Sequence, residues 1–127
     1  MDAVAIRALV DQYLAGYNAM DLDAMLAPPH PEIEFRNLSG GEVNAYASGI
    51  AALRALAQQS LQLFARRRQR LTAFQVEGER ASANIDFEAV LAADLPSGLR
   101  AGETLRLTGR GEFAFRDGRI VRIDDFS

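Results

Sequence analysis

Apolar residues recur at the spacing of an α-helix in the first turns of the chain. Six of them form one stripe, made of Ile6, Leu9, Val10, Tyr13, Leu14 and Tyr17. Asp21 is a residue type that caps helices, and the apolar residues at 22, 25 and 26 predict a second, short helix behind it. The prolines at 28, 29 and 31 end that helix.

The next segments predict a strand, a loop and a third helix. Residues 32–37 alternate between apolar and polar side chains, as in a short strand, and 39–41 read as a loop. A third helix is predicted to begin at the cap residue Ser48 and to end in the arginines 66–68, whose charges complement the helix dipole. Its apolar face consists of Ile50, Leu53, Ala57, Leu61 and Phe64.

The second half of the chain has the pattern of antiparallel strands. Segments 69–77 and 80–92 flank the hairpin signal Glu77-Gly78-Glu79, and a long strand follows at 103–115. Asp117-Gly118 then turns the chain into a final strand. Helix, helix, strand, helix and four antiparallel strands define an α+β class, with the helices on one face of the sheet.

Alternation along each strand assigns side chains to faces. In segment 80–92 one face carries Ile85, Phe87 and Ala89, and the other carries Asn84, Asp86 and Glu88. In the long strand one face carries Leu105, Leu107, Gly109, Gly111, Phe113 and Phe115. In the last strand Val121, Ile123 and Asp125 share a face opposite to Arg122, Asp124 and Phe126.

Composition excludes several classes of function. The net charge of −3 is too small to predict a nucleic acid or a membrane as partner, and no apolar run is long enough to span a membrane. There is no cysteine, and the single histidine has no carboxylate pair beside it, so neither a metal nor a cofactor is predicted. The chain starts without the pattern of a signal peptide, and we expect one cytoplasmic domain over residues 1–127.

Several strings resemble the nuclear transport factor 2-like superfamily, in its SnoaL-like branch. Residues 10–18 and 21–25 are similar to the opening helices of that family, 30–37 to its first strand and 113–121 to its terminal hairpin. The resemblance implies a cone-shaped, curved antiparallel sheet wrapped by about three N-terminal helices around an apolar pocket, and a homodimer formed through the sheet. Family members include isomerases, cyclases, epoxide hydrolases and binding proteins, so the fold does not assign the function.

Asp125 is the sharpest candidate for chemistry. The resemblance implies that its face is the pocket side, where some cyclases and epoxide hydrolases of the family carry a catalytic aspartate. A carboxylate on an apolar wall loses hydration, which raises its pKa and suits it to acid–base catalysis. The alternative is a solvated or arginine-paired residue near a frayed end of the chain. The pocket is expected to be lined by Tyr17, Phe35, Ile85, Phe87, Phe113, Phe115, Val121 and Ile123.

Tyr13 and Asn37 are the other candidates. The resemblance places Tyr13 where ketosteroid isomerases carry the tyrosine that donates to an oxyanion, and core packing is the alternative. Asn37 matches the proton-shuttling aspartate of those enzymes, but an amide cannot take up that proton. The second acid of that site would match Gly111, which has no side chain. Steroid isomerisation is therefore not expected, although Asn37 can still orient a ligand or bond the local backbone.

Other polar residues have weaker functional interpretations. An epoxide hydrolase site needs a second acid near the first, but Asp86 and Glu88 are predicted to face outward. His30 is a candidate proton carrier at the pocket mouth or a surface loop residue. The arginines 66–68 and 70 are interpreted as a solvated helix end or a dimer rim.

Two functions follow from this pattern. The first is a pocket for a small apolar cyclic molecule, with acid–base catalysis by Asp125 and an orienting donor from Tyr13 or Asn37. The second is a non-catalytic binding or dimeric association module, in which the charged outer face of the sheet forms a salt-sensitive interface.

Overall fold

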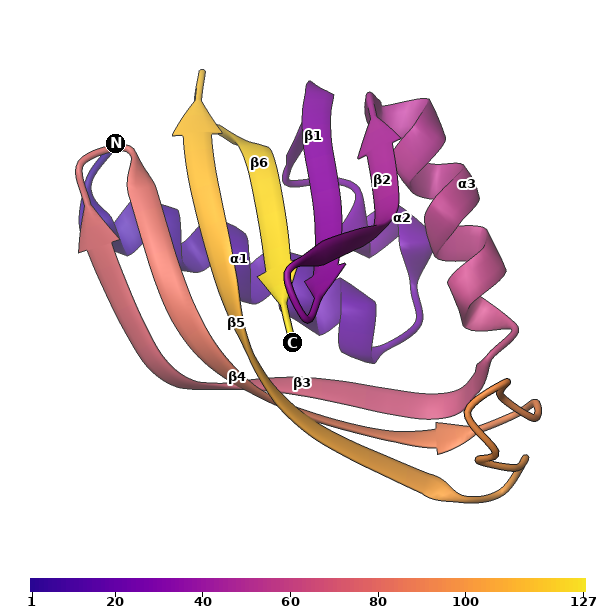
Figure 1. The fold of residues 1–127 in the computed structure, drawn as a ribbon. Helices are drawn as coiled ribbons and strands as arrows, with labels where there is room; N and C mark the ends of the chain where they lie inside the picture. Colours follow the sequence, from indigo (N-terminus) through magenta and orange to yellow (C-terminus); the bar gives the residue numbers. More distant parts are fainter.

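The computed structural model describes residues 1–127 as three helices and one six-stranded sheet (Figure 1). The helices are α1 (Ala3–Asn18), α2 (Leu22–Met25) and α3 (Ile50–Leu61), and the strands are β1 (Pro29–Ser39), β2 (Glu42–Ser48), β3 (Phe64–Glu77), β4 (Arg80–Leu91), β5 (Thr104–Arg116) and β6 (Arg119–Phe126). The predicted α+β class is confirmed. None of the three helices is long and apolar enough to cross a membrane.

Side chains at the helix starts explain two of the three helices. A carboxylate oxygen of Asp2 accepts from the backbone nitrogen of Ala5 at 2.7 Å and caps α1, and Asp21 caps α2 in the same way, as predicted. The cap of α3 is Gly49 and not Ser48, because the backbone there has a φ of 88°, which favours glycine. The Ser48 hydroxyl donates instead to Glu34, at 2.7 Å.

The sheet is mixed, because one pair of its strands is parallel. Its order is β2-β1-β6-β5-β4-β3, with β6 parallel to β1 and every other neighbouring pair antiparallel. Strand β2 is not predicted from the sequence, and it pairs with β1 in a hairpin over the loop at 40–41. Its residues are small, polar or exposed, so no alternating apolar face marks it as a strand.

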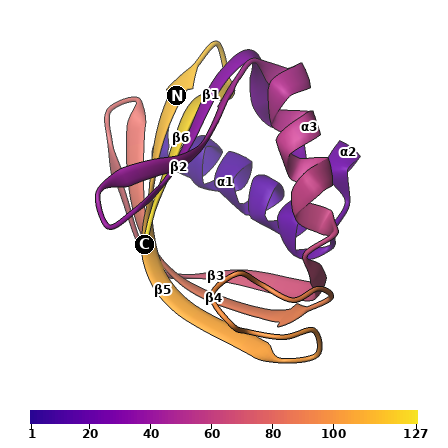
Figure 2. The same cartoon turned by 45° about the vertical axis from the view of Figure 1, so that its right-hand side comes forward.

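The long strands β3, β4 and β5 bend around α1, which lies on the concave side of the sheet (Figures 1 and 2). The pairing of β3 with β4 shifts register twice, between Phe64 and Arg66 and between Leu71 and Ala73. Each shift inserts an unpaired residue, and such bulges bend and twist a strand. In Figure 2, α3 stands across the open side of the curve from β5.

The arginines 66–68 lie in β3, so the prediction that they end a helix is wrong. Helix α3 ends at Leu61, and pairing with β4 then takes the chain into the sheet. Arginine is a good helix former, but this tertiary pairing overrides its local preference. Arg67 is opposite the buried Ala89 and faces the concave side, with 4% of its surface exposed, whereas Arg66 and Arg68 are exposed.

A bulge also corrects the predicted faces of β6. Phe113 pairs with Ile123, but Phe115 pairs with Ile120, so Val121 is the extra residue. Ile120 and Ile123 are both fully buried, whereas Val121 is half-buried and lies outside the core cluster. The strict alternation that placed Val121 beside Ile123 therefore fails at this one position.

Gly16 provides the first prediction, because α1 and α2 touch at this residue. A β-carbon on Gly16 would overlap the backbone of Met25 and Ala24. Gly16→Ala is expected to lower the free energy of unfolding by roughly 1–3 kcal/mol, although alanine is the better helix former. Gly40→Ala is the control, because the new methyl group has open space around it and the φ of Gly40 is 59°. Its expected loss of about 1 kcal/mol comes from the backbone conformation alone. Urea denaturation measures both, and an unchanged or raised stability for Gly16→Ala would contradict the close packing.

Candidate functional site

Two cavities meet on the concave side of the sheet. The first, which we call the helix cavity, has a volume of about 330 Å³ and is largely apolar, with α1, α3 and the inner strands as its walls. The second, called the terminal cavity, has a volume of about 210 Å³ and lies beside the end of β6. Four residues line both of them: Tyr17, Asn37, Gln69 and Asp125. This junction is the candidate site.

Asp125 reaches the junction because of its neighbours in the sheet. It is opposite Gly111 of β5 and Asn37 of β1. A β-carbon on Gly111 would lie 3.1 Å from Ile85 and 3.2 Å from Phe113, so glycine leaves room there for the side chains around the carboxyl group. Gly109 lets the end of β6 lie close to β5, since a β-carbon would lie 2.5 Å from the carbonyl oxygen of Phe126.

The carboxyl group of Asp125 has no partner within the chain. It takes part in none of the eleven ion pairs, and burial raises its pKa to about 7, with a further contribution from the negative charge of Asp124. The end of the chain is held in place, because the Ser127 nitrogen donates to the Leu38 carbonyl oxygen at 2.9 Å. An acid with a pKa near neutrality can both accept and return a proton.

Two tyrosines of α1 face the same space. Tyr13 lines the helix cavity with 4% of its surface exposed, and burial and the charge of Asp125 raise its pKa above the ordinary value. Burial also raises the pKa of Tyr17, although the positive charge of Arg67 opposes the shift. Both phenols therefore keep their protons at neutral pH and can donate hydrogen bonds. Tyr17 packs edge-on against Phe87, with ring centroids 6.4 Å apart.

Asn37 is held from the neighbouring strand. Its Nδ2 donates to Oδ1 of Asn44 at 2.8 Å, and Asn44 in turn donates to the hydroxyl of Ser39 at 3.0 Å. The Asn37 amide keeps its carbonyl oxygen and a second N–H for other partners. It lies next to Asp125 in the parallel pair and lines both cavities, which leaves it able to orient a ligand.

Sequence reasoning missed two polar residues of the helix cavity, Arg67 and Gln69. The Arg67 Nε donates to the Tyr17 carbonyl oxygen and its Nη1 to the Ser60 hydroxyl, both at 2.9 Å, and the guanidinium lies 3.7 Å from the Tyr17 ring centre. The Asn18 side chain bonds both backbone polar groups of Gln69, at 2.7 and 3.0 Å. The alternation of β3 would have indicated both residues, had the strand been predicted to begin before 67.

The predicted lining residues separate into two groups. Phe35 lines the helix cavity, and Ile85 and Phe87 line the terminal cavity. The others do not line either cavity: the core cluster contains Phe113, Phe115 and Ile123, and Val121 is the bulge residue described above. The core therefore fills the end of the sheet near the β5–β6 turn, and the open space lies toward the other end of β6.

His30 lies away from the junction. It is the second residue of β1, beside the β5–β6 turn, with its Nε2 3.5 Å from a carboxylate oxygen of Asp117. The parallel pairing puts Pro29 opposite Ile120 and Asn37 opposite Asp125, so His30 and Asp125 are at opposite ends of the strand pair. The interpretation of His30 as a residue of the pocket mouth is therefore wrong. No group of three or more histidine, cysteine or acidic side chains is placed to hold a metal ion.

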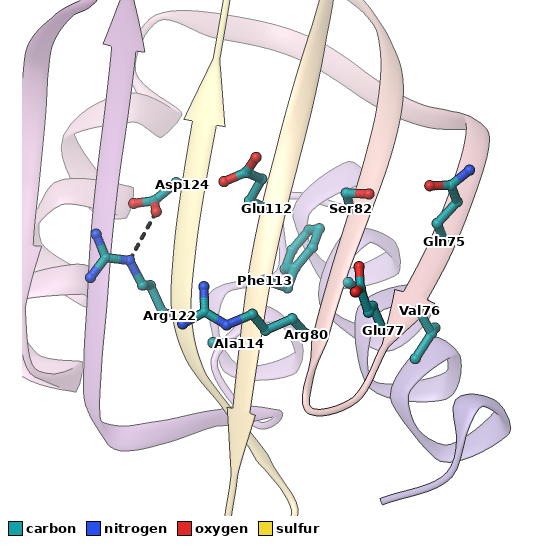
Figure 3. Close-up of a pocket in the computed structure, with 11 residues that line it drawn as sticks. Gln75, Val76, Glu77, Arg80, Ser82, Glu112, Phe113, Ala114, Arg122 and Asp124 are labelled. Atoms are coloured by element: carbon teal, nitrogen blue, oxygen red, sulfur yellow. Dashed lines mark hydrogen bonds and ion pairs between the residues drawn. The ribbon is translucent and has the colours of Figure 1, made fainter.

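The outer face of the sheet carries charged residues of both signs. Asp86 pairs with Arg70 at 3.0 Å and Glu88 with Arg106 at 3.1 Å, so both acids face outward, as predicted. A groove of about 620 Å³ crosses β3 to β6 on this face, and Figure 3 shows its polar side chains. We call it the outer groove. It is lined by Gln75, Val76, Glu77, Arg80, Ala81, Ser82, Glu112, Phe113, Ala114, Arg122 and Asp124.

Asp124 is the outward counterpart of Asp125. Its two carboxylate oxygens accept from the Nε atoms of Arg36 and Arg122, each at 2.9 Å, and the residue is 6% exposed. Burial alone would raise the pKa of this carboxyl, but the hydrogen bonds and charges of the two arginines outweigh it and hold the pKa below its usual range. Adjacent aspartates on opposite faces thus have opposite electrostatic environments.

The comparison with family models identifies the class of protein. A model described as a SnoaL-like domain matches residues 10–123, and the chain belongs to this family. The resemblance predicted from the sequence is confirmed. None of the functionally curated proteins matches the chain.

Solved structures agree with this assignment. A candidate polyketide cyclase from Xanthomonas campestris pv. campestris is 27% identical, with a TM-score of 0.81 over 97% of this chain and 90% of its own. Another from Pseudomonas putida KT2440 is 26% identical, with a TM-score of 0.74 over 94% of this chain and 88% of its own. TsrD from Streptomyces laurentii, 22% identical, shares the fold with a TM-score of 0.81 over 98% of this chain and 89% of its own.

The two aspartates give a prediction on pH dependence. The folded-state pKa of Asp125 is raised to about 7, so the unfolded chain loses this proton first and stability is lost as pH rises from about 4 to 7. Asp125→Asn removes this pH-dependent loss of stability. The variant is expected to have a free energy of unfolding higher by roughly 2–4 kcal/mol at pH 8, and the difference should disappear below about pH 4.

Asp124→Asn is the matched control with the opposite sign. The pKa of Asp124 is lowered on folding, so its contribution is present above the unfolded pKa and lost as pH falls through the folded value. This variant is expected to be less stable than the unmodified protein at pH 8. Urea denaturation between pH 3 and 8 measures both, and a destabilised Asp125→Asn at pH 8 would contradict the raised pKa.

Proposed function

We propose that the chain binds an apolar cyclic molecule at the junction of the two cavities and transfers a proton on it, with Asp125 as acid and base. The observation that supports this is one carboxyl group with no partner in the chain and a pKa of about 7, facing a space lined by aromatic and aliphatic side chains. Every other acidic side chain is exposed or has a partner: Asp86 and Asp124 pair with arginines, and Glu34 accepts from the hydroxyls of Tyr46 and Ser48. Asp125 is half-buried, loses hydration and has no partner in the chain.

The proton balance of the step is simple. The carboxylate of Asp125 accepts a proton from a carbon next to a carbonyl group, and the electron pair of the C–H bond moves to the carbonyl oxygen as an enolate. A neutral tyrosine can donate a hydrogen bond to that oxygen, and Tyr13 is the candidate donor. Return of the proton at another carbon gives an isomer. Attack of the enolate carbon on a second carbonyl instead closes a ring, and the proton held by Asp125 passes to the alkoxide oxygen that forms.

Family membership supports a small-molecule role. The chain belongs to the SnoaL-like family, and two similar structures of at least 26% identity are candidate polyketide cyclases. The residues narrow the chemistry further. Asn37 and Gly111 replace the two acids that steroid isomerisation uses, and the acids of β4 face outward, which leaves no second inward carboxylate for an epoxide hydrolase pair.

Hydrogen–deuterium exchange tests the proposal without knowledge of the natural substrate. 2-Tetralone is an apolar bicyclic ketone with acidic C–H bonds, and proton NMR follows exchange of these bonds in deuterated buffer. The protein is expected to accelerate the exchange, and Asp125→Asn to reduce the accelerated rate by on the order of 100-fold. Asp86→Asn makes the same change on the outer face and is expected to leave the rate unaltered. Equal rates for the protein and for Asp125→Asn would remove Asp125 from the mechanism.

A second candidate function is association of two copies through the outer face of the sheet. The observation that favours it is the outer groove with its mixed charges, because a two-fold axis can place the arginines of one copy against the acids of the other. Arg80, Arg122 and Glu112 are the groove residues that would form such contacts. In this arrangement the sheet forms the interface and the cavities remain open on the concave side.

Salt and charge reversal test the association. Analytical ultracentrifugation is expected to detect a dimer whose dissociation constant rises about tenfold or more between 0.05 and 0.5 M sodium chloride, because salt screens the charged contacts. Glu112→Arg in the groove is expected to weaken the dimer, whereas Asp23→Arg on α2 makes the same charge change away from the sheet. A monomer at all salt concentrations would rule out this interface.

A further inference from the structure

The positive charge of Arg67 is buried and has no acidic partner. The residue is 4% exposed, yet it takes part in no ion pair, whereas eight other arginines do. Asp125 lines the same cavity but forms no ion pair with this guanidinium. A buried charge without a counter-charge is costly, and it normally occurs where another group supplies the missing charge.

The hydrogen bonds of Arg67 leave three of its five N–H groups without a partner. Its Nε is used by the Tyr17 carbonyl oxygen and one N–H of Nη1 by the Ser60 hydroxyl. Nη2 is enclosed by the protein and makes no hydrogen bond, and it is the only enclosed side-chain nitrogen or oxygen of which this is true. One N–H of Nη1 and both of Nη2 therefore have no partner in the chain. Two N–H groups on neighbouring nitrogens of a guanidinium match the two oxygens of a carboxylate.

The guanidinium of Arg67 shares its cavity with the acid at the junction. Arg67 and Asp125 both line the helix cavity, and Tyr13 and Tyr17 line it with them. The charges of Arg67 and Asp125 both act on Tyr13 and on Tyr17, so the two phenols lie within electrostatic reach of the cation and of the acid. Apolar side chains make up most of the remaining wall, including Met25, Leu53 and Leu56.

We propose that Arg67 binds a carboxylate of the cavity's ligand, so that the substrate class is an apolar ring compound that carries an acidic group. The inference deepens the proposed function, because it rests on that ligand occupying the helix cavity. The guanidinium is rigidly oriented by Tyr17 and Ser60 before the ligand arrives. A carboxylate at its unpartnered N–H groups would supply both the missing counter-charge and the missing acceptor, with small side-chain movements to open Nη2. It would also anchor one end of the ligand.

A matched pair of probes tests this assignment. 2-Naphthoate and 2-naphthamide have the same ring system and differ in charge. Isothermal titration at pH 6, where the acid probe is ionised and Asp125 retains its proton, is expected to give a dissociation constant at least tenfold lower for the acid than for the amide. Equal affinities, tighter binding of the amide, or no binding of 2-naphthoate at 5 mM would overturn the proposal.

Variants of neighbouring arginines localise the preference. Arg67→Gln is expected to reduce the acid preference to less than threefold, and Arg67→Lys to retain part of it because the charge remains. Arg68→Gln makes the same change one residue along β3 on the exposed face, and the tenfold preference should persist. Persistence of the preference in a folded Arg67→Gln would overturn the assignment.

A measurement on the unmodified protein covers the case in which Arg67→Gln fails to fold. The Nε–Hε signal of Arg67 in a nitrogen–proton NMR spectrum is expected to shift with 2-naphthoate and not with 2-naphthamide. An unchanged signal at saturating 2-naphthoate would place the bound acid elsewhere. The outcomes also separate the two proposals. If Asp125→Asn leaves deuterium exchange unaffected, proton transfer by Asp125 is ruled out. An acid preference that depends on Arg67 would still establish the carboxylate site.

Discussion

The site depends on the way in which the end of α1 is fixed to β3. Most of α1 packs on the sheet through apolar side chains, but its last turn is held by polar bonds: the Tyr17 carbonyl oxygen accepts from Arg67, and Asn18 bonds both backbone groups of Gln69. A cation at the C-terminal end of a helix also complements the helix dipole. The helix cavity lies beside this contact, with Tyr17, Arg67 and Gln69 in its wall.

Adjacent residues of β6 show how a strand separates two electrostatic environments. Asp124 faces outward between two arginines and stays ionised, while Asp125 faces the cavities and loses its hydration without gaining a partner. The same alternation divides the arginines of β3, of which Arg67 alone is enclosed. The two aspartates are the same residue type, and so are the arginines of β3. Their chemical differences therefore come from the face of the sheet on which each lies.

Sequence patterns predicted the elements whose residues have strong local signals. The stripe of α1, the Asp21 cap, the β3–β4 and β5–β6 hairpins and the outward acids of β4 all follow from periodicity or turn chemistry. The same patterns, applied to the last strand, placed Asp125 on the face of Ile123, and the two do share it. Features that depend on pairing with a distant strand could not be predicted in this way.

Three errors share this cause. Strand β2 has no apolar face of its own and exists because β1 pairs with it. The arginines after α3 have helical preferences that pairing with β4 overrides, which hid the inward direction of Arg67. Val121 was assigned to the pocket because a bulge has no signal in a single strand. In each case the deciding partner lies far along the chain, where local periodicity carries no information.

The central position of β6 has a consequence for how the protein folds. This strand comes last in the sequence but lies between β1 and β5, and it alone joins the β1–β2 hairpin to the remaining strands. Until it docks, the sheet consists of two separate parts whose inner edges expose unpaired backbone groups, and such edges favour pairing with other chains. During synthesis the junction of the cavities therefore cannot form until β6 has left the ribosome, after every other strand of the sheet.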